Sequence, residues 1–217
     1  MNLSQYIDHT LLTPTATLND IKKHCQEAIE HHFYAVCVNE CYVSLARNYL
    51  GEYPVKVVAV VGFPLGAMST NTKIAQATYC IQQGASEIDM VLNIGFLKSG
   101  LFDKVEEEIA SIKEAIGAHV LKVILEVSYL TDQEKRQATM LAIRAGADFI
   151  KTSTGFGTVP VTLQDITLLK EFAGTDIKIK ASGGIKDTQT AQQLIDAGAS
   201  RLGTSSGINI ITHIQRS

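Results

Sequence analysis

The strongest constraint on the fold is a junction between a helical segment and a β-rich run that recurs four times along the chain. Each copy passes through Gly-Ala, within residues 81–90, 115–122, 143–152 and 195–204. The glycine fits the end of a helix, where the backbone takes a positive φ that glycine adopts without steric cost. Recurrence of one junction predicts recurrence of one structural unit, in which a helix leads the chain into the next strand.

Short β-rich apolar runs alternate with helical patterns along all 217 residues. The expected strands are residues 6–10, 34–39, 55–63, 87–93, 119–127, 148–153, 176–182 and 200–205. Their centres lie roughly 20 to 33 residues apart, the length of a strand, a loop and a crossover helix. Several helical segments open with a threonine followed three positions later by an acid: Thr17 with Asp20, Thr131 with Glu134, and Thr162 with Asp165. We therefore expect an α/β protein, a (β/α)₈ barrel forming a single domain over residues 1–217.

Composition and charge exclude several classes of function. Hydrophobic residues make up 46% of the chain, charged residues 19%, and the formal net charge is -3. That balance lacks the basic surface that binding to nucleic acid requires, and no polybasic run suggests a membrane surface. No apolar stretch approaches the ~20 residues of a membrane span, and the N-terminal segment lacks a signal-peptide pattern, so we expect a cytoplasmic protein.

The cysteines and histidines indicate neither a disulfide framework nor a metal site. Four cysteines occur without a CxxC pair, and six histidines occur without HExxH or a zinc-like cluster. We expect reduced thiols and no metal ion held by the protein.

Charged side chains are predicted to face the inside of the barrel. The residue five positions after each junction glycine is Asp89, Lys122, Lys151 or Gly203. If the four junctions share one geometry, these residues share one facing on their strands. Outward residues of a barrel strand lie under helices and should be apolar, as are the flanking Ile88, Leu121, Val123 and Ile150. Asp89, Lys122 and Lys151 are then left facing inward.

A second repeat has the form Lys-x-Ser-x-Gly, at Lys151 to Gly155 and at Lys180 to Gly184. Alternation in the run 177–180 turns both Lys178 and Lys180 inward, and Lys180 then lies at the level that Lys151 occupies on the preceding strand. Asp89 with Lys122 could be a structural ion pair inside the barrel. Two like charges on neighbouring strands are not placed there for stability, because each disfavours the other.

Paired lysines suit covalent chemistry on a carbonyl. A lysine attacks a carbonyl only as the neutral amine, and its ordinary pKa of about 10.4 keeps it protonated near pH 7. A second ammonium ~4 Å away, at an effective dielectric of ~20, supplies about 4 kcal/mol, enough to lower that pKa by about three units. The residues predict a Schiff-base lysine and leave Lys151 and Lys180 as equal candidates.

Two Gly/Ser loops indicate phosphate capture. Ser182, Gly183 and Gly184 follow the seventh expected strand, and residues 203–207 follow the eighth and precede a short apolar segment at 208–211. Loops at these two places form the recurrent phosphate site of such barrels, where backbone N–H groups approach the anion. We expect the amides around Gly183, Gly184 and Ser206 to hold a phosphate.

The chain also resembles the deoxyribose-phosphate aldolase family of class I aldolases. The segments that carry the resemblance follow in order along nearly the whole chain: IDHTLL (7–12), AVCVN (35–39), VGFPLG (61–66), EIDMVLNIG (87–95), LKVILE (121–126), FIKTSTGF (149–156), IKASGGI (179–185) and GTSSG (203–207). The resemblance implies reversible cleavage of 2-deoxy-D-ribose 5-phosphate to acetaldehyde and D-glyceraldehyde 3-phosphate, in the catabolism of deoxynucleosides, without a cofactor.

The resemblance also assigns roles to residues. It implies Lys151 as the Schiff-base former, with Asp89 and Lys180 as its proton-transfer partners. It implies a substrate pocket that includes Asp8, Cys37, Lys122, Thr154, Gly155, Ser182, Gly183, Gly184, Gly203, Ser205 and Ser206. Cys37 also fits a buried, unreactive thiol, because it lies in an apolar run. The implied partner is a small sugar phosphate, and the protein would be a homodimer or a higher homo-oligomer.

Other interpretations and one departure from the family stay open. Phosphate loops alone would also suit an isomerase or a flavin-dependent oxidoreductase on the same fold, or a sugar-phosphate binder without catalysis. Some family members have a C-terminal tyrosine that approaches the site, whereas this chain ends ITHIQRS.

Overall fold

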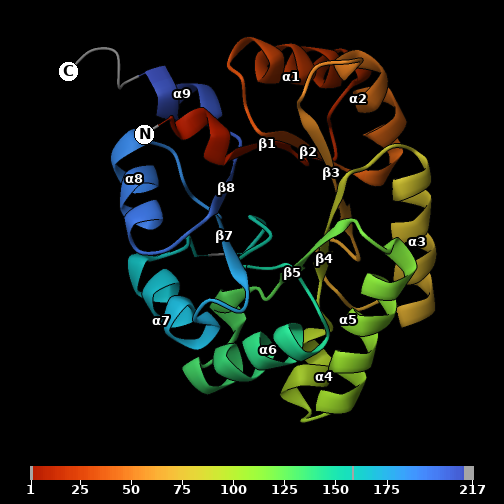
Figure 1. Ribbon diagram of the computed structural model, residues 1–217, viewed down its shortest axis with the longest axis vertical. Helices are drawn as coiled ribbons and strands as arrows, with labels where there is room; N and C mark the ends of the chain where they lie inside the picture. Colours follow the sequence, from red (N-terminus) through yellow and green to blue (C-terminus); the bar gives the residue numbers. More distant parts are fainter. Residues whose placement is uncertain (1, 158, 213–217) are drawn as a thin grey trace.

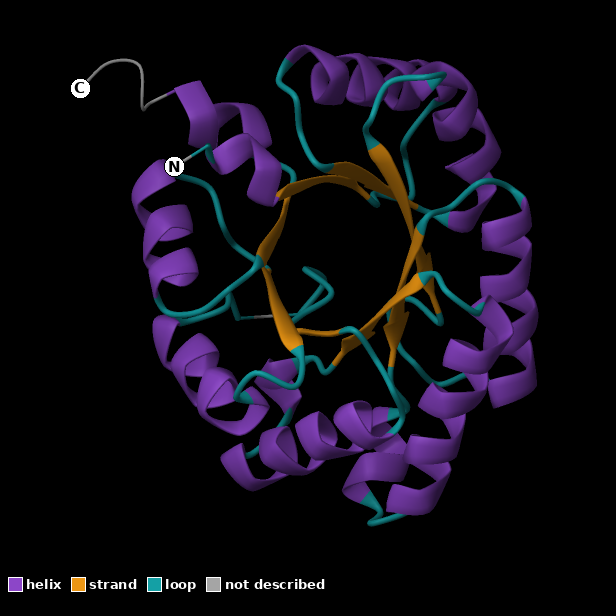
Figure 2. Cartoon of the chain, viewed as in Figure 1, coloured by secondary structure: helices purple, strands orange, loops and turns teal. Residues whose placement is uncertain are grey.

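Eight parallel strands close into a barrel that is surrounded by helices (Figures 1 and 2). The computed structural model describes residues 2–157 and 159–212, so that most of the ITHIQRS ending lies outside the described residues. The strands pair in sequential order, and the last strand pairs with the first. The expected (β/α)₈ barrel is confirmed, while its extent as one domain over residues 1–217 stays a prediction.

The strands match the eight expected runs. They are β1 (Ile7–Leu11), β2 (Ala35–Val38), β3 (Lys56–Val61), β4 (Glu87–Val91), β5 (Val120–Ile124), β6 (Phe149–Lys151), β7 (Lys178–Ser182) and β8 (Arg201–Thr204). The helices are α1 (Leu18–Glu30), α2 (Val43–Leu50), α3 (Thr70–Gln82), α4 (Ile94–Lys98), α5 (Phe102–Ile116), α6 (Asp132–Arg144), α7 (Leu163–Ala173), α8 (Thr188–Asp196) and α9 (Gly207–Thr212). Short 3₁₀ turns η1 (Leu3–Tyr6), η2 (Glu40–Tyr42) and η3 (Val127–Tyr129) complete the order.

Local chemistry starts and stops the helices where the sequence indicates. The three expected Thr/acid pairs form complete capping boxes, which satisfy two backbone donors each at the starts of α1, α6 and α7. The junction glycines all take a positive φ: Gly84 (102°), Gly117 (59°), Gly146 (77°) and Gly198 (120°). Four strands therefore start at the same distance from a helix end.

The strand register confirms the predicted facing. Asp89 lies opposite Lys122, and Lys151 lies opposite Lys180. Lys122, however, lies opposite Phe149, so Lys151 sits two residues closer to the C-terminal end of the barrel than Lys122 does. This stagger is how tilted strands close into a barrel.

Two hydrophobic clusters divide the core. The larger one lies between barrel and helices and includes the outward-facing Ile88, Leu121 and Ile150. The smaller one lies inside the barrel and consists of Leu12, Ala35, Cys37, Val58 and Val60. The strands β2 and β3 thus give the interior an apolar half, and the charged residues face it from the other strands.

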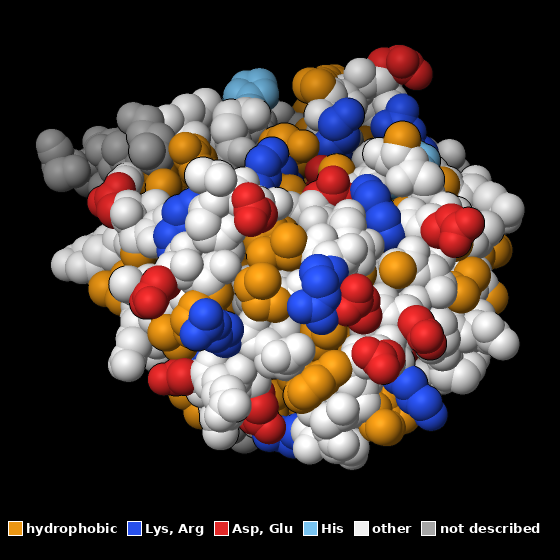
Figure 3. Space-filling view, turned by 60° about the horizontal axis from the view of Figure 1, so that its bottom comes forward, with side chains coloured by type: hydrophobic (Ala, Val, Ile, Leu, Met, Phe, Trp, Pro, Cys, Tyr) orange, Lys and Arg blue, Asp and Glu red, His pale blue; other side chains and the backbone are white. Residues whose placement is uncertain are grey.

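The surface agrees with a nearly balanced charge. On the face shown in Figure 3, acidic and basic side chains are interspersed among apolar ones, without a field of one sign. None of the helices within residues 2–157 and 159–212 has both the length and the apolar character that crossing a bilayer requires.

The outward facing of Ile150 predicts a stability effect. Ile150 is 0% exposed, and Ile150→Ala should lower the free energy of unfolding by about 2 to 5 kcal/mol, because it leaves a cavity between β6 and the helices. Met140→Ala, at a position that is 38% exposed on α6, is the control and should change it by about 0.5 kcal/mol or less. Urea unfolding of both variants is the measurement, and similar losses would contradict the assigned facing.

Candidate active site

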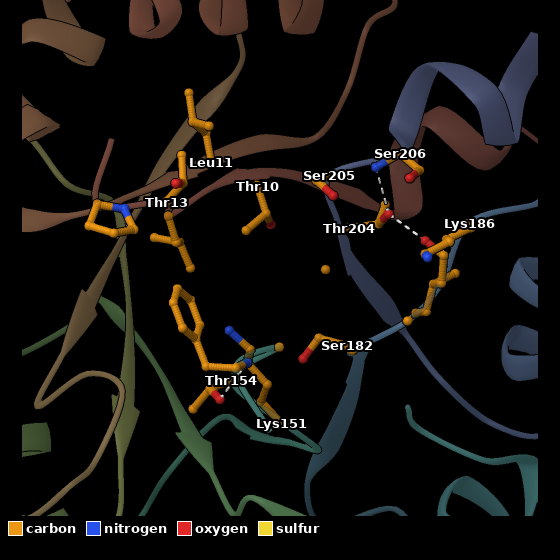
Figure 4. Close-up of a pocket in the computed structure, with 18 residues that line it drawn as sticks. Thr10, Leu11, Thr13, Lys151, Thr154, Ser182, Lys186, Thr204, Ser205 and Ser206 are labelled. Carbon is orange, nitrogen blue, oxygen red and sulfur yellow. Dashed lines mark hydrogen bonds between the residues drawn. The ribbon is translucent and has the colours of Figure 1, made fainter. Parts of the chain in front are cut away.

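A pocket of about 410 Å³ opens at the C-terminal ends of β1, β6, β7 and β8. Figure 4 shows Thr10, Lys151, Ser182 and Ser205 arranged around one opening. Nine of the expected site residues line it: Lys151, Thr154, Gly155, Ser182, Gly183, Gly184, Gly203, Ser205 and Ser206. Asp8, Cys37, Asp89, Lys122 and Lys180 do not line the pocket and are completely buried in the barrel below it.

Lys151 connects the pocket with the buried charges. It is the last residue of β6, and its side chain is 3% exposed. Its Nζ donates a hydrogen bond of 2.9 Å to Oδ2 of Asp89. The same amine thus borders the open pocket and pairs with a buried carboxylate.

Asp89 is the centre of the charged half of the interior. Its Oδ1 accepts from Lys122 at 2.8 Å, while Oδ2 accepts from both Lys151 at 2.9 Å and Lys180 at 2.8 Å. Burial alone would raise the pKa of Asp89, but the three lysines, led by Lys122, outweigh it and hold that pKa well below its usual range. Asp89 is therefore an anion.

Lys180 is held as a cation. Its Nζ donates to Asp8, in a short hydrogen bond, and to Asp89. Burial opposes the charge, but Asp8 and Asp89 together outweigh it and raise the pKa of Lys180 above its usual value. The structure therefore corrects the simple picture of two adjacent ammoniums, because both Lys151 and Lys180 contact one carboxylate oxygen that lies between them.

Lys122 was expected either in a structural ion pair with Asp89 or in the substrate pocket. It forms the expected pair with Asp89, and its Nζ also lies 2.6 Å from Oε2 of Glu87. Burial disfavours the charge, but Asp89, Asp8 and Glu87 together outweigh it, so the pKa of Lys122 is raised. Lys122 thus contacts both Asp89 and Glu87, the first residue of β4.

Several residues near the site were not anticipated from the sequence. Glu87 and Arg201 precede Asp89 and Gly203 by two residues, so strand alternation could have placed both inside the barrel. Lys186 lines the pocket and follows the Gly-Gly pair by two residues. Thr10, Thr13 and Thr204 also line it.

The loops expected to bind phosphate form one side of the pocket. Gly183 and Gly184 have φ angles of 101° and 78°, which favour glycine, and their N–H groups donate to no group within the described part of the chain. The Ser206 N–H, in contrast, donates to Oγ1 of Thr204 at 2.9 Å. Of the three expected amide donors, those of Gly183 and Gly184 are open to a ligand and that of Ser206 is already partnered.

Cys37 faces the interior next to the charged half but belongs to its apolar half. Burial raises the pKa of its thiol, although Lys180 opposes this. The residue is a neutral, buried thiol, which agrees with the expectation of low reactivity.

The loop after β6 is held by Glu126. This residue has a φ of 53°, and its Oε2 accepts from the Thr154 N–H at 3.1 Å and, in a short bond, from the Thr154 hydroxyl. Phe156, in the same loop, packs edge-on against Phe63 from the loop after β3, with ring centroids 5.4 Å apart. These contacts position the loop that carries Thr154 and Gly155 over Lys151.

One group of possible metal ligands occurs among the described residues, formed by His9, His24 and Glu27. The His9 ring lies 3.0 Å from Oε2 of Glu27, and the His24 ring lies 2.9 Å from the His9 carbonyl oxygen. The two rings stack with centroids 4.1 Å apart and an interplanar angle of 17°. The lone pair of an imidazole nitrogen lies in its ring plane, and the planes of these two rings are nearly parallel rather than directed at one point.

Comparison with known proteins shows that the chain belongs to one family of aldolases. The model of the DeoC/LacD family of aldolases matches residues 3–213. A deoxyribose-phosphate aldolase of Brevibacillus brevis is 51% identical over 212 residues, which are 98% of this chain and 96% of that protein. The enzyme of that name from Deinococcus radiodurans is 49% identical over 212 residues, 98% of this chain and 96% of its own.

Solved structures agree with the sequence relatives. An aldolase designated QR15 superposes with a TM-score of 0.95 at 42% identity, over 99% of this chain and 96% of its own. A deoxyribose phosphate aldolase from Aeropyrum pernix, described as tetrameric, superposes with a TM-score of 0.90 at 30% identity, over 98% of this chain and 91% of its own. A mandelate oxidase superposes with a TM-score of 0.64 at 11% identity, over 93% of this chain and 65% of its own, which shows the fold alone.

The buried histidine pair predicts a loss of stability in mild acid. Burial lowers the pKa of His9 to about 4 and that of His24 to about 3, whereas both titrate near 6.5 in the unfolded chain. The unfolded state therefore binds more protons below pH 6.5, and the free energy of unfolding should fall as pH drops from 6.5 to about 4, by on the order of 3 kcal/mol for His9.

Urea unfolding at several pH values measures this slope. His9→Gln and His24→Gln should each flatten it, and His32→Gln, at an exposed position, controls for the substitution itself. An unchanged slope in both buried variants would contradict the assignment.

Proposed function

Because the chain belongs to the DeoC/LacD family of aldolases, we propose that it cleaves 2-deoxy-D-ribose 5-phosphate reversibly through a Schiff base on Lys151. It is a class I aldolase of the deoxyribose-phosphate type, and the products are acetaldehyde and D-glyceraldehyde 3-phosphate. The observation that carries the assignment of Lys151 is its place, because this amine lines the pocket and also contacts Asp89.

Lys151 starts the proposed reaction as a neutral amine. Its Nζ attacks C1 of the open-chain sugar, and loss of water gives an iminium that withdraws electrons from C2. The bond that breaks is C2–C3, since acetaldehyde carries away C1 and C2. The electron pair of that bond moves to the iminium and leaves an enamine on Lys151.

The C3 hydroxyl must lose its proton as the C2–C3 bond breaks. In the proposal a water held by Asp89 and Lys180 takes this proton, and the enamine later regains a proton at C2. Hydrolysis then returns the amine and releases acetaldehyde. Support comes from the charges of the two residues, because Asp89 accepts a hydrogen bond from Lys180 at 2.8 Å, and the same carboxylate accepts one from the Lys151 amine.

The phosphate of the substrate is proposed to bind between the loops after β7 and β8. The N–H groups of Gly183 and Gly184 supply donors there, and Lys186 supplies a positive charge at the edge of the pocket. Anchoring this remote group orients C1 toward Lys151, which converts binding energy into catalysis.

The proposal extends to assembly and location. A homo-oligomer is proposed, because the relative from Aeropyrum pernix is described as tetrameric; light scattering coupled to gel filtration tests it. A single domain over residues 1–217 is also proposed. A cytoplasmic location is proposed because all four cysteines are free thiols, as is usual in a reducing compartment.

The Schiff base can be trapped. Borohydride reduction in the presence of acetaldehyde should add an ethyl group to the peptide that contains Lys151, because the iminium is reduced to a stable secondary amine. Peptide mass mapping locates the group. Lys151→Met should remove the label, whereas Lys178→Met, an exposed lysine at the start of β7, should keep it. Labelling of Lys180 or Lys122 instead would overturn the assignment, and ligand binding without any label would indicate a non-catalytic binder.

The phosphate site predicts a preference for phosphorylated substrate. Deoxyribose without its phosphate should show a much lower kcat/KM, with losses in both kcat and KM, because the remote contacts orient the reacting carbons. Lys186→Met should weaken turnover of the phosphorylated sugar by about threefold to tenfold, as expected for a screened charge at an exposed position, and leave that of deoxyribose unchanged. Lys178→Met is again the control. Equal kcat/KM values for the two sugars would contradict this site.

A further inference from the structure

The charged residues inside the barrel form a closed ring of alternating sign. Arg201 pairs with Asp8 at 2.9 Å, Asp8 with Lys180, and Lys180 with Asp89 at 2.8 Å. Asp89 pairs with Lys122 at 2.8 Å, Lys122 with Glu87 at 2.6 Å, and Glu87 returns to Arg201 at 3.6 Å. Lys151 is attached to this ring through Asp89 alone.

Glu87 and Arg201 form the part of the ring that is farthest from the pocket. Both lie at the first residue of their strands, β4 and β8, whereas the pocket opens at the other end of the barrel. The Arg201 guanidinium packs 3.4 Å from the centroid of the Tyr34 ring, and the Tyr34 hydroxyl donates to Glu87 at 3.2 Å. Neither residue lines the pocket, so neither contacts a substrate there.

The charge count of the ring singles out Lys151. Three carboxylates, of Asp8, Glu87 and Asp89, balance three cations, of Lys122, Lys180 and Arg201. The ring is neutral by itself, and a protonated Lys151 adds a seventh, unbalanced charge. An unbalanced charge in a buried site is costly, so the network is balanced when Lys151 is a neutral amine.

The other groups around the ring leave this count unchanged. From β2 comes the neutral thiol of Cys37, and β3 contributes the apolar Val58 and Val60. Lys178 lies at the exposed start of β7. Glu126 follows the C-terminal end of β5 and accepts a hydrogen bond from the Thr154 N–H. The partners in the ring lower the pKa values of Asp8 and Asp89 and raise those of Lys122, Lys180 and Arg201, which favours the charged form of each of these five groups.

We propose that Glu87 and Arg201 are positioning residues that set the protonation of Lys151 through the net charge of this ring. The inference rests on the proposed function, because it assumes that Lys151 must lose a proton before it attacks. The inference adds that Glu87 and Arg201, at the end of the barrel opposite the pocket, control the pH range in which the Lys151 amine is neutral.

Removing either charge should shift the acidic limb of the pH profile of kcat/KM, in opposite directions. Arg201→Met leaves the ring negative, favours the ammonium of Lys151, and should move the limb to higher pH. Glu87→Gln leaves it positive and should move the limb to lower pH. A unit charge ~10 Å away at an effective dielectric of ~20 corresponds to a shift of about one pH unit. Activity lost by Arg201→Met near neutral pH should therefore return at alkaline pH.

Two further variants separate charge from packing. The double variant Glu87→Gln/Arg201→Met restores a neutral ring and should bring the limb back toward that of the wild type. Arg201→Lys keeps the charge but loses the guanidinium's stacking on Tyr34, and should leave the limb in place. Arg201→Gln and Glu87→Met make the same charge changes with other side chains and replace any variant that does not fold.

A matched control lies outside the barrel. Lys73 and Glu108 form a completely buried ion pair at 2.8 Å between α3 and α5. Glu108→Gln breaks a buried pair as Glu87→Gln does, so it controls for lost stability, but it should not move the limb. Thermal unfolding of each variant records the stability cost separately.

The possible outcomes distinguish a failure of this inference from a failure of the proposed function on which it rests. Shifts of opposite sign, cancelled in the double variant, support the role of the ring. If both single variants lower kcat/KM equally at every pH, Glu87 and Arg201 are only structural and the inference is overturned. Borohydride trapping runs in parallel: absence of a label on wild-type Lys151 overturns the proposed function, whereas a retained label without shifts overturns only the inference.

Discussion

The active region depends on one buried carboxylate that serves three lysines. Asp89 is fully buried and uses Oδ1 for Lys122 and Oδ2 for both Lys151 and Lys180. Removing one partner of a buried ion pair leaves an uncompensated charge, which costs about 3 to 5 kcal/mol even for a single pair. With three lysine side chains on one carboxylate, the position of each Nζ follows from where Asp89 lies on β4.

The barrel tolerates so many buried charges because the charges alternate and are confined to one half of its interior. On β2 and β3, Cys37, Val58 and Val60 pack as an apolar cluster. Opposite them the carboxylates and cations pair in a ring, so that each buried charge has at least one partner of opposite sign. Lys151 lies at the edge of this arrangement, where its amine borders the pocket while the ring stays buried.

The pocket and the buried charges lie at different levels of this class I aldolase barrel. Loops with glycines and hydroxyls form the pocket at the C-terminal ends of the strands, which is where the proposal places the phosphate. Lys151 borders that pocket, and the paired charges are buried in the barrel beneath the pocket. Loop variation can therefore change what is bound without disturbing the charges.

The sequence by itself determined the strands, the helix caps, the inward facing of Asp89, Lys122, Lys151 and Lys180, and the two Gly/Ser loops. These follow from short-range rules, because side-chain alternation, capping boxes and glycine φ angles depend on residues a few positions apart. Only the tertiary structure decided which ammonium meets which oxygen. The contact of Lys180 with Asp8 joins residues 172 positions apart, and that of Arg201 with Asp8 joins residues 193 apart. Such contacts depend on the stagger with which β8 meets β1, and that stagger is set by closure of the whole barrel. Closure also brings Asp89 between Lys151 and Lys180, which alternation along separate strands could not reveal.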